Sequence, residues 1–106
     1  MKQDLKANIE AWKAEFGKVY KTTIEGEEYI WRKLKRKEYV DIMSGSTENE
    51  DIDKVIYERQ EKIVKMTVLY PSTIEEDLEK SAGLAITLSD EIIAKSGFGE
   101  PETKEL

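Results

Sequence analysis

The chain has 106 residues, 39% of them apolar and 38% charged, and a formal net charge of −6 at pH 7. A single domain with one modest core is expected at this length, and the acidic balance disfavours nucleic acid and anionic membranes, which attract basic surfaces. The absence of histidine and cysteine excludes a thiolate nucleophile, a histidine-activated serine and a zinc site with cysteine ligands.

The first predicted element is a helix over about residues 2–16. Its apolar side chains recur at i, i+4, i+7 and i+11 and share one stripe: Leu5, Ile9, Trp12 and Phe16. Gly17 fits the left-handed position that ends many helices. We expect Trp12 and Phe16 to belong to the core.

A β-hairpin is predicted next, with Glu25-Gly26 as a two-residue turn. One face then carries Tyr20, Thr22, Ile24, Tyr29 and Trp31, and the other carries Val19, Lys21, Ile30 and Arg32. Either face could pack on helices or on another chain, so the sequence leaves open which face is exposed.

The hairpin leads into a short predicted helix over about residues 36–43, which ends at Ser44-Gly45. A polar loop follows. Within it, Ser46 or Thr47, followed by Glu50, is the predicted cap of the next helix.

The helix after this loop has the clearest apolar pattern in the chain. Its stripe, which Arg59 interrupts, consists of Ile52, Val55, Ile56, Ile63 and Val64. Pro71 predicts an end at about Leu69 or Tyr70, because the residue before proline disfavours helical geometry.

Two helical segments are predicted in the last third of the chain. The first is a helical turn within residues 72–81, capped by Ser72 or Thr73. The second covers about residues 84–95 and buries Leu84, Ala85, Leu88, Ile92 and Ile93 in part. Gly97 fits a left-handed end, with Phe98 folding back onto Ile93. The prediction is therefore an α+β fold: a mostly helical single domain over residues 1–98, with its hairpin between the first and second helices, and a mobile acidic tail over residues 99–106.

Acidic residues form two clusters, and both are predicted to lie at helix starts. There the unpaired backbone amides favour negative charge. The clusters are Glu48, Glu50, Asp51 and Asp53, and then Glu75, Glu76 and Asp77. We therefore expect no catalytic residues, no cofactor and no metal, and we predict that the protein is not an enzyme.

Aromatic and basic residues concentrate around the hairpin and indicate a surface that binds another polypeptide. Tyrosine and tryptophan offer large contact area with a polar group, and the basic corner could attract an acidic partner. The predicted partner-binding residues are Tyr20, Tyr29, Trp31, Arg32, Arg36, Tyr39 and Tyr70. For Tyr29 and Trp31 a place in the core is the open alternative.

The order of several short motifs resembles the small tail-assembly proteins of contractile-tailed bacteriophages, a group that includes tail assembly chaperones and the T4-type baseplate hub subunit. The motifs are W-K-x-x-F-G-K-V-Y, Y-I-W-R-x-L-x-R-K-E-Y, V-L-Y-P and a closing A-G-L-A-x-x-L-S-D-E-I-I-x-x-S-G-F. They cover about residues 11–98. Lys35 departs from the expected pattern, because a small hydroxyl residue would cap the helix that follows it.

The resemblance implies a non-enzymatic role in virion morphogenesis. The chain would escort a tail protein, such as the tape measure or the baseplate hub, in the host cytoplasm. The alternative is a structural subunit that stays in the virion tail or baseplate, with its hairpin added to a neighbour's sheet. A homo-oligomer is compatible with either role, whereas nucleic acid and membrane partners are not expected.

Overall fold

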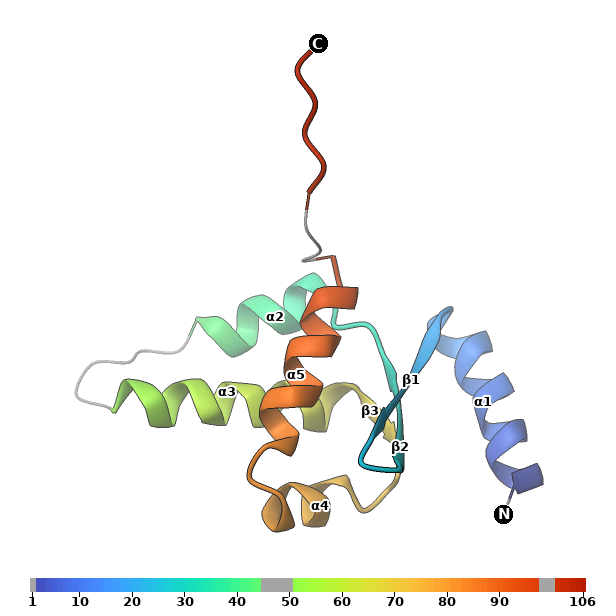
Figure 1. Cartoon of the computed structure of the whole chain (residues 1–106). Coiled ribbons are helices and arrows are strands. Elements are labelled where there is room, and N and C mark those ends of the chain that lie inside the picture. The colour runs from blue at the N-terminus through green and yellow to red at the C-terminus, as the bar shows by residue number, and fades with distance from the viewer. Residues whose placement is uncertain (1, 45–50, 98–100) are drawn as a thin grey trace.

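The computed structural model describes residues 2–44, 51–97 and 101–106. Five helices and three strands follow in the order α1 (Lys2–Phe16), β1 (Val19–Ile24), β2 (Glu27–Arg32), α2 (Arg36–Met43), α3 (Ile52–Thr67), β3 (Val68–Tyr70), α4 (Ile74–Lys80) and α5 (Leu84–Lys95). The predicted α+β class, with a hairpin between the first two helices, is confirmed (Figure 1).

The hairpin has the predicted register. Tyr20 pairs with Trp31, and Thr22 pairs with Tyr29. The turn residues Glu25 and Gly26 have φ angles of 50° and 82°, as a two-residue hairpin with the right-handed strand twist requires.

The sheet contains a third strand that sequence analysis missed. α3 ends at Thr67, and Val68–Tyr70 pairs antiparallel with β2, so the sheet order is β1-β2-β3. The predicted helix end at Leu69 or Tyr70 is therefore wrong. Pairing with the free edge of β2 satisfies the backbone of this β-branched and aromatic segment better than another helical turn would.

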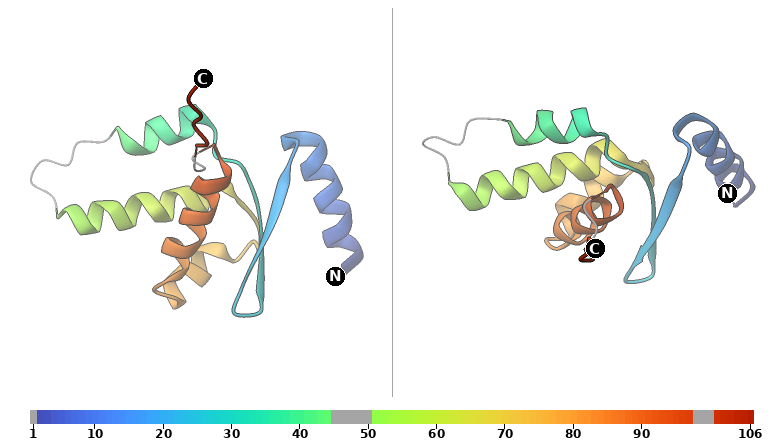
Figure 2. Two further views of the ribbon diagram at one scale, coloured as in Figure 1. Left: turned by 45° about the horizontal axis from the view of Figure 1, so that its top comes forward. Right: turned by 90° about the horizontal axis from the view of Figure 1, so that it is seen from above.

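The two faces of the sheet pack against different helices. The face with Tyr29 and Trp31 joins the main core, which α3, α4 and α5 complete. α1 lies on the opposite side of the hairpin (Figure 2). There Ile30 is only 2% exposed, and the Arg32 guanidinium lies 5.4 Å from the centre of the Phe16 ring. Trp12 and Phe16 are half-buried on this outer side and lie outside the main core cluster, contrary to prediction.

The starts of α2 and α3 are capped in different ways. α2 begins after Lys35, whose backbone amide donates to the Glu38 carboxylate at 2.9 Å, so Glu38 supplies its half of a capping box although no hydroxyl residue stands at the cap position. α3 is capped by Asp51, which accepts from the Asp53 amide at 2.9 Å. The predicted cap at Ser46 or Thr47 is therefore wrong, and those residues, with Gly45 and Glu50, lie outside the described ranges.

After α5, the described residues form no further helix or strand. Gly97 has a φ of 105°, which confirms the predicted left-handed end, whereas the predicted contact of Phe98 falls on a residue outside the described ranges. Residues 101–106 are exposed and have no regular secondary structure (Figure 1). Across the described residues, no helix combines the length and apolar character needed to cross a membrane.

Candidate partner-binding surface

The structure places Tyr29 and Trp31 in the core. Trp31 is 1% exposed and Tyr29 is 6% exposed. The Trp31 indole donates to Thr22 Oγ1 at 2.8 Å, and its ring stacks on Tyr20 at 4.7 Å between centroids. The predicted role of Tyr29 and Trp31 as contact residues is therefore corrected, because helices of the same chain occupy that face of the hairpin.

The remaining predicted aromatic and basic residues are not brought together into one surface. Tyr20 and Tyr39 are half-buried and pack against the core cluster. Tyr70 is 36% exposed at the sheet edge formed by β3, and Arg36 is exposed at the start of α2. Only Arg36 and Tyr70 are well exposed to a partner in this conformation.

Arg32 is held by contacts within the chain. Its two Nη groups donate to the two carboxylate oxygens of Glu38, each at 2.8 Å, and Nη2 also donates to the Met66 carbonyl oxygen at 3.1 Å. The Arg32 side chain in this pair is 12% exposed. Arg32 therefore joins β2 to α2 and α3, and its predicted role in binding a partner stays a prediction.

The Arg32 pair makes stability depend on pH. Its hydrogen bonds lower the pKa of the Glu38 carboxyl, and the Lys35 amide adds to this effect. Because the folded pKa lies below the unfolded value of about 4.3, the pair stabilises the protein above that pH, and the stabilisation is lost as pH falls through the folded pKa. We expect Glu38→Gln to lower the free energy of unfolding by roughly 1–2 kcal/mol at pH 7.

Urea unfolding of the wild type and of Glu38→Gln, at pH 7 and at pH 3, measures this difference in the free energy of unfolding. The difference in the free energy of unfolding between wild type and Glu38→Gln should shrink at pH 3, because acid moves Glu38 toward the neutral form that Gln resembles. Glu28→Gln is the matched control, because Glu28 forms an exposed pair with Lys21 at 3.7 Å and should change stability by less than about 0.5 kcal/mol. An equal stability difference between wild type and Glu38→Gln at both pH values would contradict a pH-dependent contribution from the Arg32–Glu38 pair.

An apolar groove lies where α2, α3 and α5 meet. It has a volume of about 190 Å³ and is lined by Met43, Ile56, Arg59, Gln60, Ile63, Ser89, Asp90 and Ile93. Ile56 is 47% exposed, and Ile52, one turn earlier on the same stripe of α3, is 57% exposed.

Ile52 and Ile56 belong to the predicted apolar stripe of this helix, and the structure leaves both of them exposed. α5 packs on the C-terminal half of α3, where Ile63 and Val64 are fully buried. The N-terminal half of α3 extends beyond α5 alongside α2 (Figures 1 and 2). The apolar stripe of α3 therefore continues beyond the part of this helix that α5 covers.

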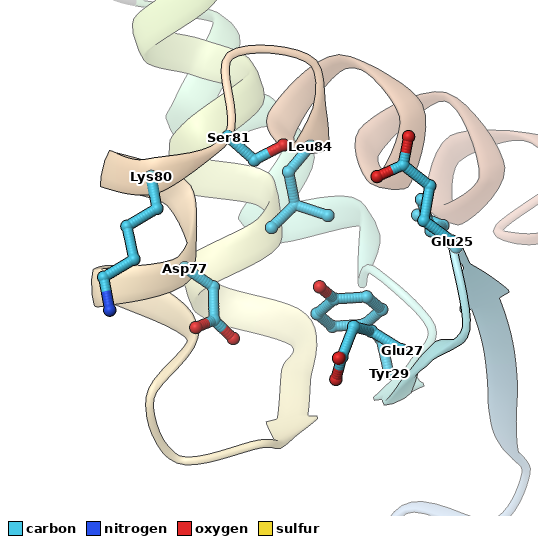
Figure 3. Close-up of a pocket in the computed structure, with 8 residues that line it drawn as sticks. Glu25, Glu27, Tyr29, Asp77, Lys80, Ser81 and Leu84 are labelled. Carbon is cyan, nitrogen blue, oxygen red and sulfur yellow. The ribbon is translucent and has the colours of Figure 1, made fainter.

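An acidic pocket lies between the hairpin tip and the junction of α4 and α5 (Figure 3). It has a volume of about 430 Å³ and is lined by Ile24, Glu25, Glu27, Tyr29, Asp77, Lys80, Ser81 and Leu84. Burial raises the pKa of the Tyr29 hydroxyl, and the charges of Asp77, Glu27 and Glu25 raise it further. Carboxylates from two segments that are distant in sequence, the hairpin and α4, therefore raise the pKa of the same Tyr29 hydroxyl.

The acidic residues have the helix-start positions that were predicted where the structure describes them, since Asp51 caps α3 and Glu75, Glu76 and Asp77 occupy the first turn of α4. Across the described ranges, no group of acidic side chains is close enough to hold a metal ion. Asp77 also lines the acidic pocket, which sequence analysis missed because its walls come from distant segments. Comparison with protein-family models, curated proteins and solved structures finds no match for this chain.

Proposed function

We propose that this chain is a non-enzymatic assembly protein that binds an amphipathic helix of another polypeptide in its apolar groove. The observation that carries the proposal is the exposed aliphatic stripe of α3, which borders a groove between three helices. Grooves of this kind bind helices through apolar residues spaced three and four apart. Leaving Ile52 and Ile56 in water is unfavourable, and a partner helix would relieve that exposure.

The sequence resemblance supplies the class of partner. It points to a phage tail protein, the tape measure or the baseplate hub, which the chain would escort in the host cytoplasm until assembly. Charge is compatible with that role, because the second part of the chain, residues 44–106, carries fifteen acidic and seven basic residues and would help to keep an apolar client in solution.

A second candidate function is permanent incorporation into the tail or baseplate. The observation that favours it is the position of β1 at the edge of the sheet, with β2 as its one strand partner in the described chain. Such an edge presents unpaired backbone groups to which a neighbouring strand could add.

Mass spectrometry of purified virions separates the two candidates. An escort should be abundant in infected cells and absent from finished particles, whereas a structural subunit should be present in a fixed number of copies per particle. We expect absence. A reproducible, stoichiometric amount in washed particles would reject the escort role in favour of the structural one.

A further inference from the structure

The outer edge of the sheet is formed by β1, which has β2 as its only strand partner in the described ranges. The two-residue turn makes Ile24 and Glu27 the first hydrogen-bonded pair of the hairpin, and the bonding pattern alternates from there. The backbone groups of Val19, Lys21 and Thr23 therefore point away from β2. They form no hydrogen bond to another described residue, so they can pair with a further strand.

β1 lacks the features that usually keep an edge strand from pairing. It has no proline, and its pairing with β2 is regular over all six residues. Five of the six residues are β-branched or aromatic, which favours strand formation. The one charged side chain, Lys21, forms an ion pair with Glu28 of β2 at 3.7 Å.

The core-facing side of the hairpin is less covered at β1 than at β2. On β2, Tyr29 and Trp31 are 6% and 1% exposed. On the same face of β1, Tyr20, Thr22 and Ile24 are only half-buried. Apolar area therefore remains in contact with water at this edge, and an added strand would cover part of it.

We propose that β1 pairs antiparallel with β1 of a second copy of this chain, about a two-fold axis at Thr22, and so joins two three-stranded sheets into one. In this register Tyr20 of each copy lies opposite Ile24 of the other on the half-buried face, and Lys21 lies opposite the uncharged Thr23. The other axis that pairs as many residues of β1 passes through Lys21. It would place the two Lys21 side chains opposite each other, which is unfavourable.

Charge at the two ends of β1 favours a second copy in this orientation. Lys18 precedes the strand, and Glu25 and Glu27 lie at the hairpin tip; all three are exposed. Antiparallel pairing about Thr22 brings Lys18 of each copy beside the acidic tip of the other, twice per dimer. The apolar groove takes no part in this contact, so the inference goes beyond the proposed function and does not rest on it.

The contact is small, so the dimer is expected to be weak. One strand from each copy buries less than the roughly 800 Å² per partner of a standard stable interface, and we expect a dissociation constant of roughly 100 µM. The chain is then mainly a monomer at the micromolar concentrations of a chromatography column, and it pairs when it is concentrated.

Sedimentation equilibrium of the full chain, from about 10 µM to about 1 mM, measures the association. We expect the weight-average mass to rise from near that of one chain toward that of two. Hydrogen exchange followed by NMR over the same range locates the contact. Exchange of the Lys21 and Thr23 amides should slow as the concentration rises, whereas the Thr22 and Ile24 amides, which bond to β2 in both states, should change little.

Two charge variants at Thr23 test the register, because Thr23 lies opposite Lys21 of the second copy. Thr23→Lys places like charges opposite each other twice per dimer and should raise the dissociation constant at least about fivefold. Thr23→Glu places opposite charges there and should lower it at least about twofold. Thr87→Lys is the matched control at an exposed threonine of α5 and should change it less than about twofold. Thermal melting checks that each variant is folded.

A mass of one chain up to about 1 mM would overturn the inference, as would dissociation constants that move in the same direction in both Thr23 variants. Association without slower exchange at Lys21 and Thr23 would place the contact elsewhere and reject it. Slower exchange at these amides only after a tail protein is added would assign the edge to a strand of that protein instead. None of these outcomes bears on binding in the apolar groove, which variants of that groove test separately.

Discussion

Trp31→Ala is expected to lower the free energy of unfolding by about 3–5 kcal/mol, the largest effect of any single substitution considered for this protein. The side chain is 1% exposed, stacks on Tyr20 and donates a hydrogen bond to Thr22. Its removal leaves a cavity between the sheet and the helices. Because small domains are stable by about 5–15 kcal/mol in total, the variant should be close to unfolding at 37 °C.

Chemical denaturation monitored by circular dichroism measures this loss, with Trp12→Ala as the control. Trp12 is half-buried on α1 and lies outside the main core cluster, so the same change should have less than half the effect there. Similar losses for both variants would contradict the assignment of Trp31 to the centre of the core. Binding of a partner by the folded fraction of Trp31→Ala should be unchanged.

Ile56→Glu is expected to abolish recovery of a co-purified tail protein, the largest expected effect on binding. A carboxylate in the apolar groove would be buried by the partner helix without a counter-charge, which is strongly unfavourable. Because Ile56 is 47% exposed in the free protein, the substitution should change its own stability by less than about 1 kcal/mol.

Met66→Glu is the matched control for this experiment. Met66 is also on α3, is 38% exposed and does not line the groove, so the variant carries the same kind of change at a comparable exposure. Co-purification of the same tail protein is compared for the two variants and the wild type. Equal recovery with Ile56→Glu and Met66→Glu would show that the groove is not the binding surface.

Local sequence signals predicted much of the fold. The boundaries of α1, α2 and α5 follow from helical periodicity together with a stop signal, such as Gly17 or Gly97, and the turn at Glu25-Gly26 fixed the hairpin register. These features depend on neighbouring residues alone. A single sequence therefore contains the information that determines them.

Most of the failures concern contacts between distant segments. β3 forms because Val68–Tyr70 meets the free edge of β2, which a local helical pattern cannot indicate. The buried face of the hairpin and the exposure of Ile52 depend on where α5 crosses α3. The pocket around Tyr29 likewise needs Asp77, which is distant in sequence. The pairing of Arg32 with Glu38 was not predicted, because it depends on how the chain turns from β2 into α2.

Size-exclusion chromatography with light scattering, applied to the chain co-expressed with candidate tape-measure and baseplate hub proteins, tests most directly whether this molecule binds another polypeptide. The account predicts one soluble species whose mass equals the chain plus its partner. Elution of the chain by itself, or only with further copies of itself, in every such co-expression would contradict it.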